Sequence, residues 1–192
     1  MSERIALLDE VRACRLCQPH LPLGPRPVLQ MAPSARLLVI GQAPGTRVHE
    51  TGIPWNDPSG ERLRDWLQMD RDTFYDPARV AIMPMGFCYP GRGRGGDLPP
   101  RPECAATWHR PLLAQLLAIR LTLLIGQYAQ RHYLPQWQGS VSANVAAWQE
   151  HPDGLFALPH PSPRNRRWLA QRPWFDEQVV PALRAAVARA FS

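Results

Sequence analysis

The chain has 192 residues, a length that favours one well-buried domain covering residues 1–192. Its formal net charge is +6, and all 22 of its basic residues are arginine. The absence of lysine excludes Schiff-base catalysis by a lysine amine and phosphate binding by a Walker-type lysine. An all-arginine basic surface suits bidentate recognition of phosphates, although genome composition accounts for the same bias.

Short apolar runs bounded by glycine or proline alternate with helical patterns along the chain. In chain order the sequence predicts a helix at about 3–13, a strand at 36–40, a helix at about 59–69, a strand at 80–85, a helix at about 102–119, a strand at 121–125, a helix at about 127–134 with a further turn near 141–149, a strand at 155–158 and a closing helix at 174–191. This alternation predicts an α/β fold, a three-layer α-β-α sandwich with a four-stranded parallel sheet. In such sheets ligands bind beyond the carboxyl ends of the strands.

The sequence offers no candidate membrane span. Gln115 and Arg120 interrupt the best apolar stretch, which lies between Leu112 and Ile125. The first residues mix acidic, basic and apolar side chains, unlike a signal peptide. We therefore expect a cytoplasmic protein with no membrane partner, in which cysteines are free thiols or metal ligands rather than disulfides.

Two strand-end segments carry the candidate chemistry. After Ile40 the chain reads Gly41-Gln42-Ala43-Pro44-Gly45, whose glycines leave backbone N–H groups free to cradle a flat polar ligand. An ordinary glycine-proline turn would have the same composition. After Leu158, His160 stands between two prolines that restrict its backbone, and a polar, basic stretch follows. Candidate contacts to phosphates and bases there are Ser162, Arg164, Arg166 and Arg167.

The four cysteines form a second candidate site. Cys14 and Cys17 are spaced C-x2-C, whereas Cys88 and Cys104 lie far apart in sequence. Such a set can hold zinc or an iron-sulfur cluster, although unligated thiols remain an alternative. The segment between Cys88 and Cys104 is rich in glycine and arginine, which is typical of a flexible surface loop or of an arm that tracks phosphates.

Four segments together resemble the uracil-DNA glycosylase superfamily, specifically its iron-sulfur branches, families 4 and 5. They are GQAPG at 41–45, TGIPWNDPSGERL at 51–63, the cysteine pattern and LPHPSPRN at 158–165. The resemblance extends from Cys14 to the closing helix. It implies base excision from DNA and a structural [4Fe-4S] cluster, with zinc the less favoured metal, on Cys14, Cys17, Cys88 and Cys104.

The resemblance also implies roles for residues of the strand-end segments. Trp55 matches the aromatic residue that stacks on a flipped base, beside the backbone of Gly41, Gln42 and Ala43. His160 matches the family's strand-end histidine. Arg164 occupies the place where related enzymes insert an apolar wedge into the duplex.

The sequence departs from the family 4 pattern at its acidic and amide positions. Gln42 replaces a glutamate, and no asparagine lies near Pro84 to read the uracil edge. Asp57 is the best remaining catalytic carboxylate and Glu50 is the second. Asp57 could equally cap the helix that begins at Pro58.

We therefore expect a monofunctional DNA glycosylase that removes uracil or a related deaminated base, acts as a monomer and leaves an intact abasic site. The alternative is a nucleic-acid-binding protein that has kept the fold but has weak or no excision activity. A nucleotide-dependent enzyme ranks last, because the chain lacks GxGxxG, lysine and a paired acidic metal site.

Overall fold

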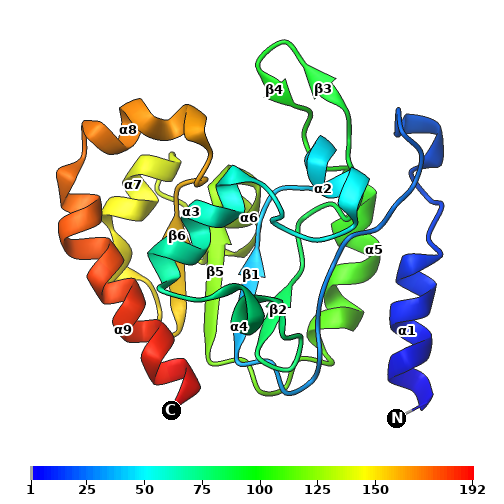
Figure 1. Cartoon of the computed structure of the whole chain (residues 1–192), viewed down its shortest axis with the longest axis horizontal. Coiled ribbons are helices and arrows are strands. Elements are labelled where there is room, and N and C mark those ends of the chain that lie inside the picture. Colours follow the sequence, from blue (N-terminus) through cyan, green and yellow to red (C-terminus); the bar gives the residue numbers. More distant parts are fainter. Residues whose placement is uncertain (1) are drawn as a thin grey trace.

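A central four-stranded sheet organises the computed structural model, which describes residues 2–192 and the side chains of residues 6–192. The strands are β1 (Leu37–Ile40), β2 (Val80–Ile82), β5 (Leu121–Ile125) and β6 (Leu155–Leu158), in the order β2-β1-β5-β6. All three ladders are parallel. Helices pack on both sides of the sheet (Figure 1), so the predicted three-layer α-β-α fold is confirmed.

The helices are short, and several were not predicted. The α-helices are α1 (Ser2–Arg12), α2 (Thr46–Thr51), α3 (Pro58–Leu67), α4 (Arg71–Tyr75), α5 (Pro102–Leu113), α6 (Gly126–Tyr133), α7 (Val141–Ala146), α8 (Arg166–Ala170) and α9 (Val180–Phe191). A small antiparallel hairpin joins β3 (Arg92–Gly93) to β4 (Gly96–Asp97). The sequence analysis missed α2, α4, α8 and this hairpin.

Proline accounts for two boundaries that the sequence analysis placed wrongly and for a local change of helix type within the predicted closing helix. Strand β2 ends at Ile82 rather than at 85, because Pro84 has no N–H to extend a ladder. Helix α5 ends at Leu113 rather than at 119, soon after Pro111 removes a backbone donor. The predicted closing helix begins with a π-helical turn, Phe175–Val179, before Pro181 near the start of α9.

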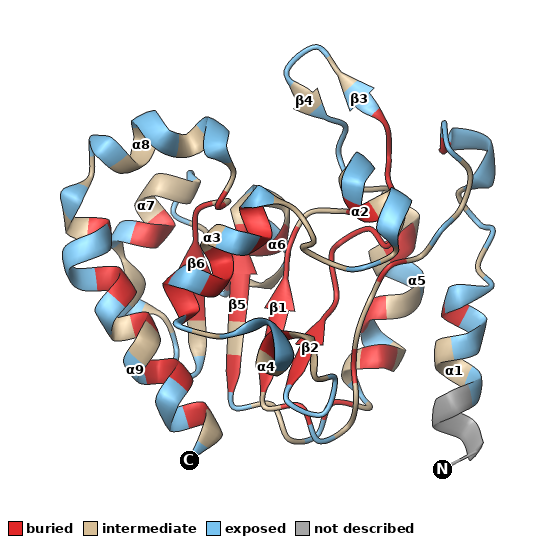
Figure 2. Cartoon of the chain, in the orientation of Figure 1, coloured by how far each residue is buried: buried red, intermediate tan, exposed pale blue. Residues whose placement is uncertain are grey.

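Two hydrophobic clusters cover the two faces of the sheet, because alternate strand residues point to opposite sides. On one face, Leu37 and Val39 of β1 pack with residues of α3 and α9. On the other face, Leu38 and Ile40 pack with residues of α5 and α6. Figure 2 shows the strands as the most continuously buried segments. In the described part of the chain, no helix is long and apolar enough to cross a membrane.

The carboxyl ends of the strands face one edge of the molecule. The β3–β4 hairpin and α2 lie at this edge, and α8 lies there on the side of β6 (Figure 1). The segment after β2 stays attached to the loop after β1, because Met85 and Gly86 donate backbone hydrogen bonds to Gly41 (2.9 Å) and Gln42 (3.0 Å). The core therefore fixes the strand-end loops against one another.

Candidate active site

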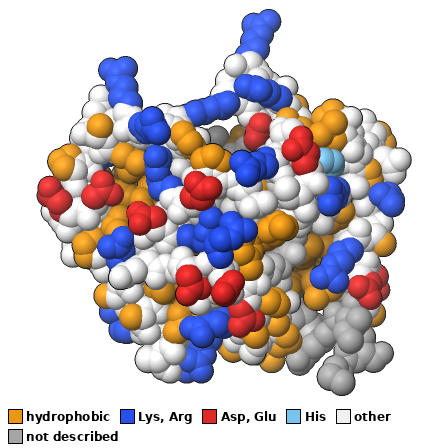
Figure 3. All heavy atoms as spheres, viewed as in Figure 1, with side chains coloured by type: hydrophobic (Ala, Val, Ile, Leu, Met, Phe, Trp, Pro, Cys, Tyr) orange, Lys and Arg blue, Asp and Glu red, His pale blue; other side chains and the backbone are white. Residues whose placement is uncertain are grey.

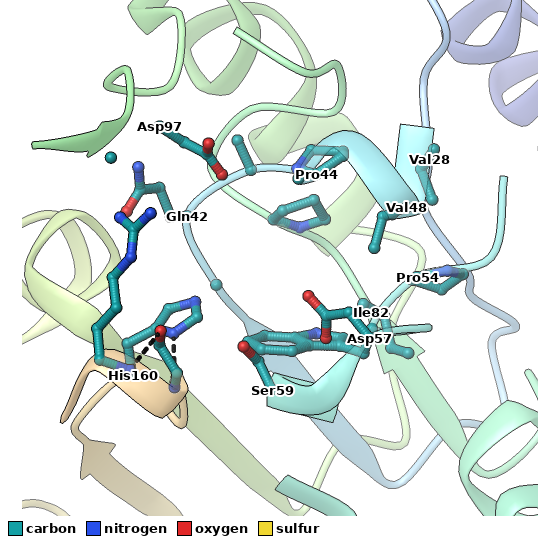
Figure 4. A pocket seen from close by; sticks show the side chains of 18 of the residues that line it. Val28, Gln42, Pro44, Val48, Pro54, Asp57, Ser59, Ile82, Asp97 and His160 are labelled. Carbon is teal, nitrogen blue, oxygen red and sulfur yellow. Dashed lines mark hydrogen bonds between the residues drawn. The ribbon is translucent and has the colours of Figure 1, made fainter. Parts of the chain in front are cut away.

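A cavity of about 430 Å³ opens at the carboxyl ends of β1, β2 and β6 (Figure 4). Its volume lies in the range of pockets that hold a small organic molecule such as a nucleobase. Its lining residues are Val28, Gly41, Gln42, Ala43, Pro44, Gly45, Val48, Pro54, Trp55, Asp57, Ser59, Ile82, Pro84, Gly95, Gly96, Asp97, His160, Ser162, Arg164 and Asn165. The cavity therefore lies where parallel sheets bind their ligands.

The cavity has two walls of different origin. We call the lining residues of the segments 41–45, 55–57 and 160–165 the sheet wall, because these segments follow β1 and β6 or pack on them. We call Gly95, Gly96 and Asp97 of the β3–β4 hairpin the hairpin wall. The sequence analysis predicted most of the sheet wall and none of the hairpin wall.

Trp55 is held in a conformation that needs support, because its φ of +55° lies in the left-handed region. Its carbonyl accepts hydrogen bonds from the Tyr75 hydroxyl (3.2 Å) and from Nη1 of the buried Arg64 (3.4 Å). A Cβ on Gly60 would lie 1.7 Å from this carbonyl oxygen, and one on Gly41 would lie 2.8 Å from the indole ring. Two glycines and two polar side chains thus fix the indole at the cavity.

His160 lies beside Trp55 at the cavity, with 5.5 Å between the ring centroids and 34° between the ring planes, so the two rings are in contact. The backbone N–H of Ser162 donates to Nδ1 of His160 (3.2 Å), and the Asn165 side chain donates to the His160 carbonyl (2.7 Å). Because Nδ1 accepts a hydrogen bond, the proton of the neutral ring resides on Nε2. Burial lowers the pKa of His160 below its usual value, although the nearby Asp57 carboxylate opposes this shift. The ring is therefore a neutral N–H donor at pH 7.

Asp57 combines the two roles that the sequence left open. Its Oδ1 accepts a hydrogen bond from the Gly60 N–H (2.8 Å), so Asp57 is the N-cap of α3. The same carboxylate lines the cavity, where Figure 4 shows it on the side opposite His160. Capping the helix fixes the carboxylate, and the cavity gives it access to a ligand.

The hairpin wall closes the cavity from the side opposite the sheet. Gln42 Nε2 donates to the Leu98 carbonyl (3.1 Å), and Arg164 Nη1 donates to the Gly95 carbonyl (3.2 Å). These two bonds tie the turn of the hairpin and the residue that follows β4 to the strand-end loops. Asp97 is the carboxylate of this wall, and sequence reasoning missed it because a glycine-rich loop gives no signal of where it folds.

The other predicted site residues divide into two groups. Gly41, Gln42, Ala43, Ser162 and Arg164 line the cavity together with the residues already described. Glu50 is exposed on α2 and does not line the cavity. Arg166 and Arg167 are exposed on α8, outside the cavity. Figure 3 shows arginine side chains projecting from the edge that carries α8 and the hairpin. The edge around the cavity mouth therefore presents positive charge.

The four cysteines converge although they come from distant segments. Cys14, Cys17, Cys88 and Cys104 line one small pocket beside α5. Their sulfur atoms accept hydrogen bonds from nearby N–H groups: Trp108 Nε1 donates to Cys14 (3.4 Å) and the Phe87 N–H donates to Cys104 (3.3 Å). Burial raises the pKa of Cys88 to about 11 and that of Cys104 to about 12.

The cysteine pocket brings together four sulfur donors, the number that a [4Fe-4S] cluster and a tetrahedral zinc ion both take. Among the described residues, no group of three or more histidine, cysteine, aspartate or glutamate side chains is arranged to hold one metal ion. N–H donors to sulfur, as at Cys14 and Cys104, are a feature of cluster sites.

The fold and site define an α/β protein with a cavity at the carboxyl edge of a parallel sheet, lined by the Trp55 indole, the His160 imidazole and two carboxylates. The family model described as Uracil DNA glycosylase superfamily matches residues 29–184. The chain therefore belongs to the uracil DNA glycosylase superfamily, as its sequence motifs predict.

Proposed function

We propose that the chain is a cytoplasmic, monomeric and monofunctional DNA glycosylase that hydrolyses the N-glycosidic bond of uracil or a related deaminated base in DNA. The observation that carries the proposal is the cavity that His160 and Trp55 line together, where His160 Nδ1 accepts from the Ser162 N–H and leaves Nε2 as the donor of the neutral ring. The target nucleotide must leave the base stack to reach this cavity. The flipped base would stack on Trp55, beside the backbone of Gly41 to Ala43.

The chemistry follows from the charges that develop during bond cleavage. The departing base becomes negative and the sugar becomes positive, so each side of the site should complement one of them. His160 Nε2–H donates a hydrogen bond to the base oxygen O2 as negative charge accumulates there. Asp57 faces the sugar and stabilises its positive charge. Because the chain has no lysine, no Schiff base forms and the product is an intact abasic site.

The positive edge around the cavity supports binding to DNA. Arg164, Arg166 and Arg167 are exposed there, and Ser162 adds a hydroxyl at the cavity mouth. Arginines and hydroxyl groups commonly bind phosphates and so fix the position of the protein on the duplex. These residues would hold the strand while the target base occupies the cavity.

The test is an excision assay with purified protein and labelled duplexes that contain uracil, hypoxanthine or a thymine mismatch. Single-turnover release of at least one of these bases is expected, with strand breakage only after alkali treatment. Strand cleavage before alkali would contradict a monofunctional mechanism. A duplex with only normal base pairs is the control.

A second candidate is a DNA-binding protein without excision activity. Gln42 in place of an acid, and Pro84 at the cavity where no asparagine reads the base, favour this alternative. Both candidates predict DNA affinity that falls with salt. Binding without release of any of the three bases would establish the second candidate.

We also propose that Cys14, Cys17, Cys88 and Cys104 hold a [4Fe-4S] cluster. When bound, the cluster would supply structural cross-linking between the N-terminal segment and the loop that carries the hairpin. Anaerobically purified protein should contain four irons and four sulfides per chain, in line with its four cysteines. Colourless protein with stoichiometric zinc would contradict this.

The Cys88→Ser variant tests the structural role of the cluster. Amide hydrogen exchange should become faster in residues 88–104, because the hairpin loses its attachment. Exchange in β1 should stay slow, because this strand is paired on both sides and buried in the core. Equal protection of residues 88–104 in the variant and the wild type would show that the hairpin does not depend on the cysteine site.

A further inference from the structure

We propose that Asp97, in the hairpin wall, is a second catalytic carboxylate of this site and accepts the proton of the attacking water. The inference rests on the proposed glycosylase function and assigns a role that neither Asp57 nor Glu50 covers. It is based on where the hairpin places this side chain and on which groups the side chain does not contact.

Asp97 lies at the cavity mouth although the hairpin that carries it is basic. It is paired with Arg92 across the two strands, and Arg94 lies near the tip. Among residues 6–192, no arginine lies within salt-bridge distance of its carboxylate, and no hydrogen bond involves that group. The carboxylate is thus exposed and, among these residues, unpaired, so it is open to a ligand.

The carboxylate lies against the loop after β1. A Cβ built on Gly45 would lie 3.5 Å from Asp97 Oδ2, so the oxygen rests directly over the glycine backbone. Figure 4 shows Asp97 and Asp57 on different sides of the cavity, with His160 on a third side. The loop from Gly41 to Gly45 carries no acid of its own, so Asp97 brings a carboxylate to it.

The hairpin that holds Asp97 is attached close to this position. Immediately after Asp97, the Leu98 carbonyl accepts from Gln42 Nε2 (3.1 Å) and the Leu98 N–H donates to Gly91 (2.8 Å). Before it, the Gly95 carbonyl accepts from Arg164 (3.2 Å). Attachment on both sides fixes the backbone of Asp97 relative to the sheet wall.

The two carboxylates then have different tasks. One oxygen of Asp57 is engaged by the α3 cap, and its carboxylate stabilises the positive sugar. Asp97 accepts a proton from water while the water oxygen bonds to C1′ of the sugar. The bond between C1′ and the base breaks with its electron pair moving to the base, which His160 Nε2–H stabilises as an anion. The proton on Asp97 is then released to solvent, so atoms and charges balance.

The experiment compares Asp97→Asn with Asp153→Asn, which removes the same charge at an exposed position away from the cavity. Single-turnover excision should fall about 100-fold in Asp97→Asn, as expected for loss of a positioned general base. Affinity for a duplex with a tetrahydrofuran abasic analogue should stay equal or increase, because a negative charge near phosphates is lost. Asp97→Glu should recover part of the rate.

Three other results would each overturn the inference. If Asp97→Asn excises as fast as Asp153→Asn, the inference is overturned and the proposed function stands. If affinity for the abasic duplex falls together with the rate, Asp97 holds the hairpin rather than serving as the base, and the inference is again overturned. If the wild-type protein excises none of the three bases, the proposed function fails first and this inference fails with it.

Discussion

The two walls of the cavity are built in different ways. The sheet wall continues directly from the core: Gly41 follows Ile40 (1% exposed), and His160 lies two residues after Leu158 (0% exposed). The hairpin wall is a two-stranded ribbon, with Asp97 exposed, that contacts the sheet wall through the side chains of Gln42 and Arg164. Isolated ribbons of this kind have little stability of their own.

The two walls therefore hold different catalytic groups. Groups that must keep one orientation, such as the His160 ring and the Trp55 indole, are on the wall that the core fixes. The hairpin wall depends on a few hydrogen bonds from Gln42 and Arg164 to hold Asp97 in place. Catalysis by preorganised groups needs both walls, but the core fixes the sheet wall and these side-chain bonds fix the hairpin wall. Changes in the sheet wall should therefore affect the contacts of His160 and Trp55 with the base, and changes in the hairpin wall should affect proton transfer to Asp97.

His160→Ala should have the largest effect of the predicted changes. Removal of a donor that acts on developing negative charge costs roughly 100-fold or more in rate. The fold should be retained, because the imidazole lies at the cavity rather than in the core. The measurement is single-turnover excision, with the affinity for the tetrahydrofuran duplex as the control. Near wild-type excision by His160→Ala would remove His160 from the mechanism.

The pH dependence of excision by the wild-type enzyme tests whether the neutral His160 ring is the hydrogen-bond donor. Because burial lowers the pKa of His160, with Asp57 as the acid that opposes the shift, the ring is already neutral at pH 7. Raising the pH from 7 to 9 removes no proton from it, so the excision rate should not fall. A rate that falls as the pH rises through neutrality would indicate that the imidazolium is the donor.

Much of the sheet wall could be predicted from the sequence, because strand ends in a parallel sheet converge on one edge. Gly41 and His160 follow this rule, whereas Trp55 was predicted from the resemblance to the superfamily. The double role of Asp57 could only be stated as two alternatives, because helix capping and ligand contact use the same carboxylate. The structure shows that one oxygen caps α3 and that the carboxylate also lines the cavity.

The hairpin wall could not be predicted, and the reason is physical. Its strands are two residues each and contain glycine, so neither hydrophobic alternation nor β propensity marks them. Their position depends on tertiary contacts to Gln42 and Arg164, which are distant in sequence. Helices α2 and α4 were missed because they are too short for helical periodicity to be detected.

A pair of glycine substitutions tests the contrast between the walls with a smaller expected effect. In Gly41→Ala the new Cβ would lie 2.8 Å from the Trp55 ring, so the indole must shift. Excision should fall on the order of tenfold, below the roughly 100-fold that a full 1 Å misplacement can cost. Gly95→Ala is the matched control in the hairpin wall, because its Cβ would meet nothing within 4 Å. Equal effects of the two variants would contradict the difference between the walls.

Arg164→Ala should have the smallest effect, and it acts at the junction of the walls. Loss of one phosphate contact should weaken binding to all duplexes alike and reduce the slope of log affinity against log salt by about 1. Arg189→Ala on α9 is the control for net charge, because this arginine is exposed outside the cavity. Arg164 also donates to Gly95 in the hairpin. If excision at saturating enzyme falls while the salt slope is unchanged, the main role of Arg164 is to hold the hairpin wall in place, and its assignment to DNA binding is wrong.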